Sequence, residues 1–166
     1  MGVISWGAPS GANAVTIRPP HCDDVENLVE MGSRMHSESA YSFLPFDRDK
    51  VRRLILGHIA DTETQCAFVA ESGGVVIGMI GGYLTDYFFS EERMACDTVL
   101  FVDQTNRGTA AAARLIEAFR EWAVRRGARE LSLGVTTEIR AEQVGRFYEW
   151  LGFRRAGAIY KQRLGA

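Results

Sequence analysis

The chain has 166 residues, a formal net charge of −2 at pH 7, an isoelectric point near 5.9, and 46% hydrophobic against 24% charged residues. This balance predicts one globular domain with a substantial core, and it argues against a polyanion-binding surface and hence against a nucleic-acid partner. The three cysteines, Cys22, Cys66 and Cys96, form no C-x-x-C pair and lie near no histidine at zinc-ligand spacing, so we expect no metal and a reducing compartment.

Residues 1–13 are rich in Gly, Ser, Ala and Pro, and they are predicted to form a flexible leader before a single domain over residues 14–166. The leader lacks the basic start and the long apolar run of a signal peptide. No later apolar run approaches the length of a membrane span. We therefore expect a cytoplasmic protein with no membrane partner.

In the first half of the chain the patterns predict a strand, two helices and three more strands. The strands are expected at 14–18, 65–71, 75–84 and 94–102. The first helix is expected near Asp23 and Asp24, whose carboxylates favour a helix start, and the second begins at Asp47, a good N-cap residue. Ser72-Gly73-Gly74 is predicted to join two of the strands in a tight hairpin.

In the second half, an alanine-rich amphipathic helix follows the strand and ends at Gly127. A strand is expected at 130–135, then a short helix that Gly152 closes, then an extended segment at 153–164 with a break near Gly157. This order of elements predicts a mixed α/β layered fold.

The junction between the last long strand and the alanine-rich helix is predicted to bind an anion. A glycine turn into a helix start presents free backbone N–H groups, with the positive end of the helix dipole behind them. Gly108 permits close approach, Ala110 and Ala112 keep the first turn free of bulk, and Arg107 can supply a charge-assisted contact to phosphate. The alternative is that the small residues let the helix pack on the sheet and that Arg107 is solvated.

Two motifs carry a resemblance to a known family. VDQTNRGTAAA at 102–112 resembles the pyrophosphate loop of the GNAT superfamily of N-acetyltransferases, and FYEWLGF at 147–153 is similar to the usual ending of that family's last helix. The resemblance extends over residues 14–164. It implies a mixed, mostly antiparallel twisted sheet of six or seven strands flanked by four helices.

The resemblance also implies direct transfer of an acetyl group from acetyl-CoA to an amine on a small molecule or a peptide, without a metal. The cofactor would bind to the strand Leu100, Phe101 and Val102 and to the loop Arg107, Gly108, Thr109, Ala110, Ala111 and Ala112. A backbone N–H of the strand would hold the oxyanion, and Tyr148 would be the general acid that protonates the departing thiolate. The other interpretation of Tyr148 is a core tyrosine whose hydroxyl reaches a backbone partner.

The general base stays open. Strand alternation puts Cys96 and Thr98, neither a convincing base, on the face of Leu100, and it puts Asp97 on the opposite face. Other candidates, each more simply explained by a structural or solvated role, are Glu71, Asp86, His36 and Glu38. Ala141 stands where many relatives have a cofactor-contacting asparagine, so an acyl-CoA-binding module with little or no turnover is the alternative to an enzyme.

The acceptor is not specified by the sequence, because the acceptor loops are the most variable part of the family. Aromatic residues are frequent in the loops and at the strand ends, and some of them are expected to line a partly apolar acceptor pocket. They are Tyr41, Phe43, Phe46, Tyr83, Tyr87, Phe88 and Phe89. A homodimer is expected from the family, with a partner completing the short C-terminal end.

Overall fold

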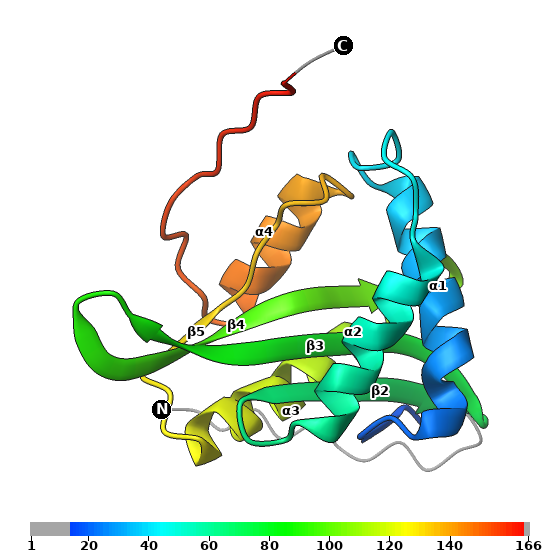
Figure 1. The fold of residues 1–166 in the computed structure, drawn as a ribbon, viewed down its shortest axis with the longest axis horizontal. Coiled ribbons are helices and arrows are strands. Elements are labelled where there is room, and N and C mark those ends of the chain that lie inside the picture. Colours follow the sequence, from blue (N-terminus) through cyan, green and yellow to red (C-terminus); the bar gives the residue numbers. More distant parts are fainter. Residues whose placement is uncertain (1–13, 165–166) are drawn as a thin grey trace.

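The computed structural model describes residues 14–164, so the predicted leader at 1–13 lies outside the described residues. Four α-helices and five strands follow one another along the chain (Figure 1). The elements are β1 (Thr16–Arg18), α1 (Val25–Glu38), α2 (Arg48–Ala60), β2 (Gln65–Ser72), β3 (Val75–Tyr87), β4 (Ser90–Val102), α3 (Ala111–Arg125), β5 (Glu130–Ser132) and α4 (Ala141–Trp150), with short 3-10 turns η1 (Cys22–Asp24) and η2 (Gln104–Asn106).

The five strands form one sheet in the order β1-β2-β3-β4-β5. The first four are antiparallel, and β5 runs parallel to β4, which confirms the predicted mixed and mostly antiparallel sheet. The expectation of six or seven strands is wrong for the described chain. β5 has only three residues and offers almost no edge for pairing, so the segment 153–164 runs away from the sheet as an extended chain (Figure 1).

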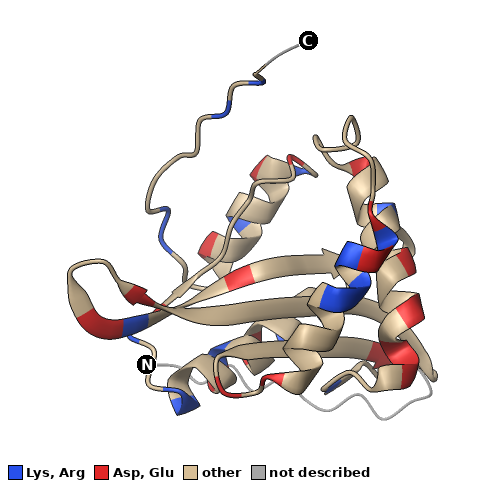
Figure 2. Cartoon of the chain, in the orientation of Figure 1, with Lys and Arg blue, Asp and Glu red and all other residues tan. Residues whose placement is uncertain are grey.

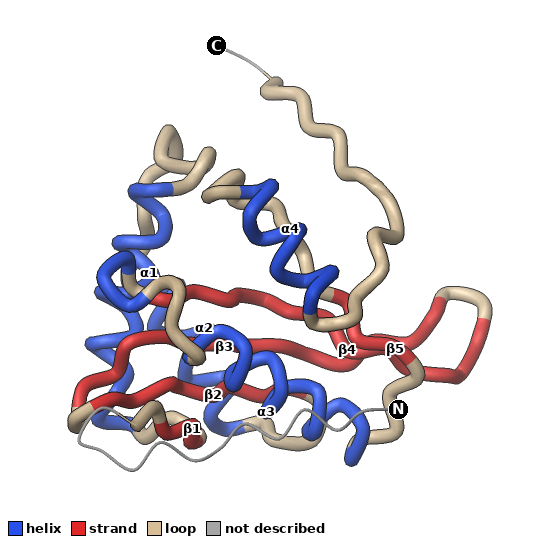
Figure 3. Tube along the Cα trace, turned by 180° about the vertical axis from the view of Figure 1, so that it is seen from behind, coloured by secondary structure: helices blue, strands red, loops and turns tan. Residues whose placement is uncertain are grey.

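The sheet is covered on both faces. α1 packs on one face, where Leu28 and Met31 form a cluster with strand residues, and α2 lies beside α1 (Figure 1). Arg52 of α2 pairs with Glu26 of α1 at 2.7 Å, where oppositely charged segments of the two helices face each other (Figure 2). α3 lies on the other face, as the view from behind shows (Figure 3).

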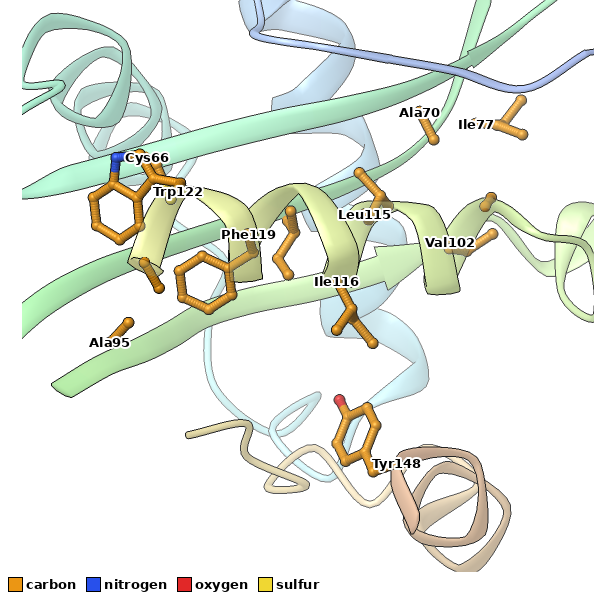
Figure 4. Packing of buried hydrophobic residues seen from close by; sticks show 13 residues of the cluster. Cys66, Ala70, Ile77, Ala95, Val102, Leu115, Ile116, Phe119, Trp122 and Tyr148 are labelled. Atoms are coloured by element: carbon orange, nitrogen blue, oxygen red, sulfur yellow. The ribbon is translucent and has the colours of Figure 1, made fainter. Parts of the chain in front are cut away.

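The core beneath α3 is the larger of the two apolar clusters. Leu115, Ile116 and Phe119 are each at most 1% exposed, and they project from α3 onto the sheet (Figure 4). Full burial of each such side chain is worth about 1.5–3 kcal/mol. The same cluster includes Tyr148 from α4, so α3 and α4 share one face of the sheet.

A β-bulge interrupts the pairing of β3 with β4. Gly81 pairs with Val99 and Gly82 with Asp97, which leaves Thr98 as the extra residue of β4. Side chains before and after the bulge therefore alternate out of phase. Ala95 faces the α3 cluster, whereas Val99 packs against the α1 cluster although four positions separate the two. The bulge decides which side chains of β4 reach the candidate site.

Candidate active site

The predicted anion site is a turn between β4 and α3 with several amides available. Gly108 has φ of +85°, a conformation that favours glycine, and nothing lies within 4 Å of where its Cβ would be. In the described chain, the amides of Gly108 and Ala110 have no hydrogen-bond partner. The first turn of α3 adds amides that the helix cannot satisfy. Free amides at a glycine turn before a helix can bind a phosphate group.

Two of the predicted loop residues serve the loop itself. The Thr109 hydroxyl donates to the carbonyl of Asn106 at 2.8 Å and accepts from the amide of Ala111 at 3.3 Å. The side chain of Ala111 is completely buried in the core beneath α3. Thr109 therefore shapes the turn, and Ala111 anchors the helix start on the sheet.

Arg107 is held in place by the protein, so the alternative in which it is solvated is wrong. Its Nε donates to the carbonyl of Val102 at 3.0 Å, and its Nη2 donates to Glu38 at 2.7 Å. The guanidinium also lies 5.3 Å from the ring centroid of Phe101. A second ion pair, Arg34 with Asp103, joins the same end of α1 to the same loop at 2.9 Å. A phosphate that binds here would share the guanidinium with Glu38.

The free edge of β4 forms one wall of a cavity of about 190 Å³. β5 pairs with β4 only from Met94 to Cys96, so the edge of β4 beyond Cys96 has no strand beside it. The cavity brings together six of the predicted site residues: Leu100, Phe101, Val102, Arg107, Ala112 and Tyr148. Its lining does not include Gly108, Thr109, Ala110 or Ala111. An open strand edge that leads to a helix start suits an extended ligand with a phosphate at one end.

Tyr148 projects from α4 toward Ile116 of α3 (Figure 4), and only 7% of the residue is exposed. Its ring packs against Phe147 and Phe153. Within residues 14–164 its hydroxyl has no hydrogen-bond partner, so the backbone partner that a purely structural tyrosine would require is missing. Burial, and then the charge of Asp97, raise the pKa of Tyr148, so its hydroxyl keeps its proton at neutral pH.

Asp97 lies in this cavity with Tyr148, and the expectation that it points to the opposite face with Val99 is wrong. The bulge at Thr98 reverses the alternation and turns the carboxylate toward α4. Its Oδ1 accepts a hydrogen bond from the amide of Gly134 at 2.8 Å. Burial raises the pKa of Asp97, against the opposing effect of that hydrogen bond, and a raised pKa makes the carboxylate a stronger base.

The sequence did contain a signal for the bulge. Gly81 and Gly82 are adjacent in the strand opposite, and glycine inside a strand often marks a bulge or a close approach. The close approach is real, because a Cβ on Gly82 would lie 2.4 Å from Cζ of Phe119. The side chains of β4 therefore do not alternate strictly between the two faces of the sheet at the bulge.

Three of the other candidates for a base form ion pairs. Glu71 pairs with Arg18 at 2.8 Å, Glu38 pairs with Arg107, and Asp86 pairs with Arg93 at 3.7 Å. The fourth, His36, has a buried Nε2 without a hydrogen-bond partner among the described residues, and its ring packs beside Phe46, outside the lining of the cavity. Burial raises the pKa of Cys96, which keeps the thiol protonated. The structure thus leaves Asp97 as the carboxylate that lines the cavity.

No group of three or more His, Cys, Asp and Glu side chains able to hold a metal ion occurs within residues 14–164. Across the same residues, each helix is too short or too polar to span a membrane.

Comparison with solved structures shows a shared fold. The aminoglycoside N-acetyltransferase AAC(6')-Iy in complex with CoA superposes with a TM-score of 0.75 at 19% identity, over 95% of this chain and 99% of that chain. The same enzyme in complex with the bisubstrate analogue CoA-S-monomethyl-acetylneamine gives a TM-score of 0.73 at 19% identity, over 92% and 99%. Glucosamine-6-phosphate N-acetyltransferase from Arabidopsis thaliana gives 0.72 at 13% identity, over 92% and 99%.

Among curated proteins, no sequence matches this chain. The model of the acetyltransferase (GNAT) family matches residues 32–153, a range that contains both motifs, the bulge and the whole cavity wall of β4. The chain belongs to the GNAT acetyltransferase family.

Proposed function

We propose that the protein is an N-acetyltransferase that moves an acetyl group from acetyl-CoA to an amine by direct attack. One observation carries this proposal: a cavity at the free edge of β4 is lined by both a partly buried carboxylate, Asp97, and a buried phenol, Tyr148. A general base and a general acid on one cavity are what amine acylation requires. The AAC(6')-Iy structures with CoA and with a bisubstrate analogue support the choice of cofactor.

Coenzyme A would bind mainly through the backbone. Its diphosphate would accept hydrogen bonds from the amides of Gly108, Ala110 and the first turn of α3, with Arg107 beside them. Its extended arm would lie along Leu100–Val102 and pair with the free edge of β4 as an added strand. Ala141 has no polar side chain, so it would add no side-chain hydrogen bond to the cofactor.

In the reaction, Asp97 takes a proton from the ammonium form of the acceptor, and the neutral amine attacks the thioester carbonyl. A backbone N–H of Leu100–Val102 stabilises the oxyanion that forms. As the carbon–sulfur bond breaks, the nitrogen loses its second proton, which passes to the departing sulfur to give the amide and the free thiol, and Asp97 later releases its own proton to water. Tyr148 donates a hydrogen bond to the sulfur or relays this proton. Its raised pKa makes it a weak acid, so the hydrogen bond is the larger part of its contribution.

The test is release of free thiol from acetyl-CoA in the presence of a panel of amines, with calorimetric titration of CoA alongside. We expect CoA to bind and thiol to be released only when an amine is present. Binding of CoA without thiol release from any amine would favour the alternative, a binding module without turnover. Absence of CoA binding would contradict both.

We also propose that the protein is a cytoplasmic homodimer. The β3–β4 hairpin extends beyond its neighbouring strands and ends in Phe88 and Phe89, which are 98% and 71% exposed (Figure 1). A pair of exposed aromatic rings at a hairpin tip suits burial against a second copy. Sedimentation analysis of the full chain should give the mass of a dimer, and a monomer at micromolar concentration would contradict this.

A further inference from the structure

Lys161 of the C-terminal segment contacts the rest of the molecule through its head group. Its Nζ donates to the carbonyl of Thr136 at 2.8 Å and to the hydroxyl of Tyr41 at 3.3 Å. It also lies 3.3 Å from Oε1 of Glu138 and 4.7 Å from the ring centroid of Tyr41. A carbonyl, a carboxylate and an aromatic face are the groups that recognise an ammonium ion. We refer to Tyr41, the carbonyl of Thr136 and Glu138 as the ammonium site.

The ammonium site is built from two loops that are joined to each other. Tyr41 belongs to the α1–α2 loop, and Thr136 and Glu138 belong to the loop between β5 and α4. The amide of Ala40 donates to the carbonyl of Thr137 at 2.9 Å and connects the two loops. Glu138 has φ of +63°, a conformation that is uncommon for residues other than glycine and is often found at functional sites.

The ammonium site adjoins the cavity of the candidate active site. Thr136 lines that cavity together with Asp97 and Tyr148. An ammonium group bound to the Thr136 carbonyl therefore lies at the rim of the space in which the acceptor amine must reach the thioester.

Lys161 is held by its charge rather than by burial. The neighbouring side chains of its segment are exposed, with Ile159 at 69% and Tyr160 at 93%. The segment makes one further ring contact, where the guanidinium of Arg163 lies 3.9 Å from the ring centroid of Phe43. All the charged residues of 154–164 are basic (Figure 2). A soluble cation can compete with the contacts of Lys161, because little buried apolar surface becomes exposed when the segment dissociates.

We propose that the ammonium site is an acceptor subsite, that it binds one amino group of an acceptor with at least two, and that Lys161 fills it when no acceptor is present. This inference rests on the proposed function, because it assigns the acceptor class of the same cavity. The hydrogen bond to Tyr41, and then the one to Glu138, raise the pKa of Lys161, so an amine at this position stays protonated. A protonated amine cannot attack a thioester. The attacking amine is therefore a second amino group of the same molecule, and the acceptor is a diamine or a polyamine.

The experiment is calorimetric titration of the full chain, saturated with CoA, with 1,5-diaminopentane and with n-pentylamine. The two probes have the same chain length and differ in one amino group. We expect the diamine to bind at least tenfold more tightly. Lys161→Ala should strengthen diamine binding several-fold because it removes the internal competitor, whereas Tyr41→Leu and Glu138→Gln should weaken it about tenfold.

Two matched variants control for charge alone. Arg155→Ala removes one exposed positive charge from the same segment, and Glu142→Gln removes one exposed negative charge near the same loop. Both should bind the diamine as the unmodified protein does. Equal affinity for the two probes, or a Lys161→Ala variant that behaves like Arg155→Ala, would overturn the inference.

The binding experiment contains no acetyl-CoA, so its outcome is separate from that of the proposed function. Tight diamine binding without any thiol release from acetyl-CoA would leave the ammonium site intact and refute the acetyltransferase. Thiol release that is as efficient with n-pentylamine as with 1,5-diaminopentane would support the acetyltransferase and refute the diamine class.

Discussion

The hydroxyl of Thr98 and Nε2 of His58 lie 3.3 Å apart, and this contact joins the extra residue of β4 to α2. Nδ1 of His58 lies 2.9 Å from the carbonyl of Leu54, which can only accept, so Nδ1 is the donor. In the neutral ring, Nε2 then accepts from Thr98. His58 is 6% exposed and packs beside Gly81, opposite the bulge. The pair thus fixes the bulge that turns Asp97 toward Tyr148.

Thr98→Val should therefore lower turnover through Asp97. The variant keeps the shape of the side chain but leaves a buried ring nitrogen without a partner, which costs about 1–3 kcal/mol of stability. We expect kcat to fall about tenfold, in line with the loss of precise positioning of a base, while KM for acetyl-CoA changes little. Thr98→Ser keeps the hydroxyl and should restore kcat. Steady-state kinetics that show the same kcat for both variants would contradict this role.

Asp97→Asn should reduce activity and increase stability. General base catalysis contributes about 10²–10⁴-fold, so kcat should fall by at least about 100-fold.

The stability effect of Asp97→Asn follows from the pKa. Burial raises the folded-state pKa of Asp97, so this group favours folding below its unfolded pKa. That contribution is lost as the pH rises through the folded-state pKa. The melting temperature of the variant should exceed that of the unmodified protein at pH 7, and the gap should close near pH 4. A lower melting temperature at pH 7 would contradict this account.

The raised pKa of Asp97 also predicts the acidic limb of the pH–rate profile. Asp97 must be ionised to accept a proton, so kcat/KM should rise with pH through a value above the usual aspartate range. Asp97→Asn should remove this limb from the pH–rate profile. A limb that persists unchanged in the variant would point to another group.

Tyr148→Phe should separate binding from turnover. The hydroxyl has no protein partner within the described residues, so its removal should leave stability within about 1 kcal/mol of the unmodified protein. CoA affinity should be unchanged, because the cofactor contacts are mainly backbone contacts. Since the donor to the departing sulfur is lost, we expect kcat to fall about 10- to 100-fold. A tyrosine with only a structural role would instead give a destabilised variant with normal kcat.

Arg107 and Glu38 should have opposite effects on CoA affinity. Arg107→Ala removes a charge-assisted contact and should weaken CoA binding by about 1.5–3 kcal/mol, or about 10- to 100-fold. Glu38→Gln removes the carboxylate that shares the guanidinium at 2.7 Å, so it should leave CoA binding unchanged or stronger. Calorimetric titration with CoA measures both. Weakening by Glu38→Gln to the same extent would show that the ion pair serves the loop rather than competing with phosphate.

Gly82→Ala should destabilise the core beneath α3. The added Cβ would lie 2.4 Å from Cζ of Phe119 and 2.9 Å from the carbonyl oxygen of Cys96, so the strand and the ring must move apart. Overpacking of this kind costs about 1–3 kcal/mol. Gly57→Ala is the matched control, because nothing lies within 4 Å of its Cβ position in α2, and it should stabilise by about 0.5–1 kcal/mol. Denaturant unfolding measures both changes.

Local patterns predicted much of the fold correctly. Asp47 caps α2 as expected, with its side chain accepting from the amide of Lys50 at 2.9 Å. The hairpin at Ser72-Gly73-Gly74 joins β2 to β3, with both glycines at positive φ. The glycine turn at Gly108 leads from β4 into α3. These features depend on residues within a few positions of one another, so they are readable along the chain.

The predictions that failed depend on contacts between distant parts of the chain. Residues 153–164 have a pattern typical of strands, but a strand forms only where an edge is available, and β5 is too short to supply one. The partner of Arg107, Glu38, lies 69 positions earlier in the sequence. The ammonium site combines two loops that lie far apart in the sequence, and neither of them shows a motif by itself.

The sequence by itself determined the family, the order of elements and the glycine turn before α3, because short-range periodicity and local backbone preferences specify them. The tertiary structure alone decided which face Asp97 occupies, since one extra residue in β4 reverses every side chain beyond it and only the pairing with β3 reveals that residue. The base of the proposed reaction was therefore visible as a residue in the sequence, but its position beside Tyr148 follows from the register of the sheet.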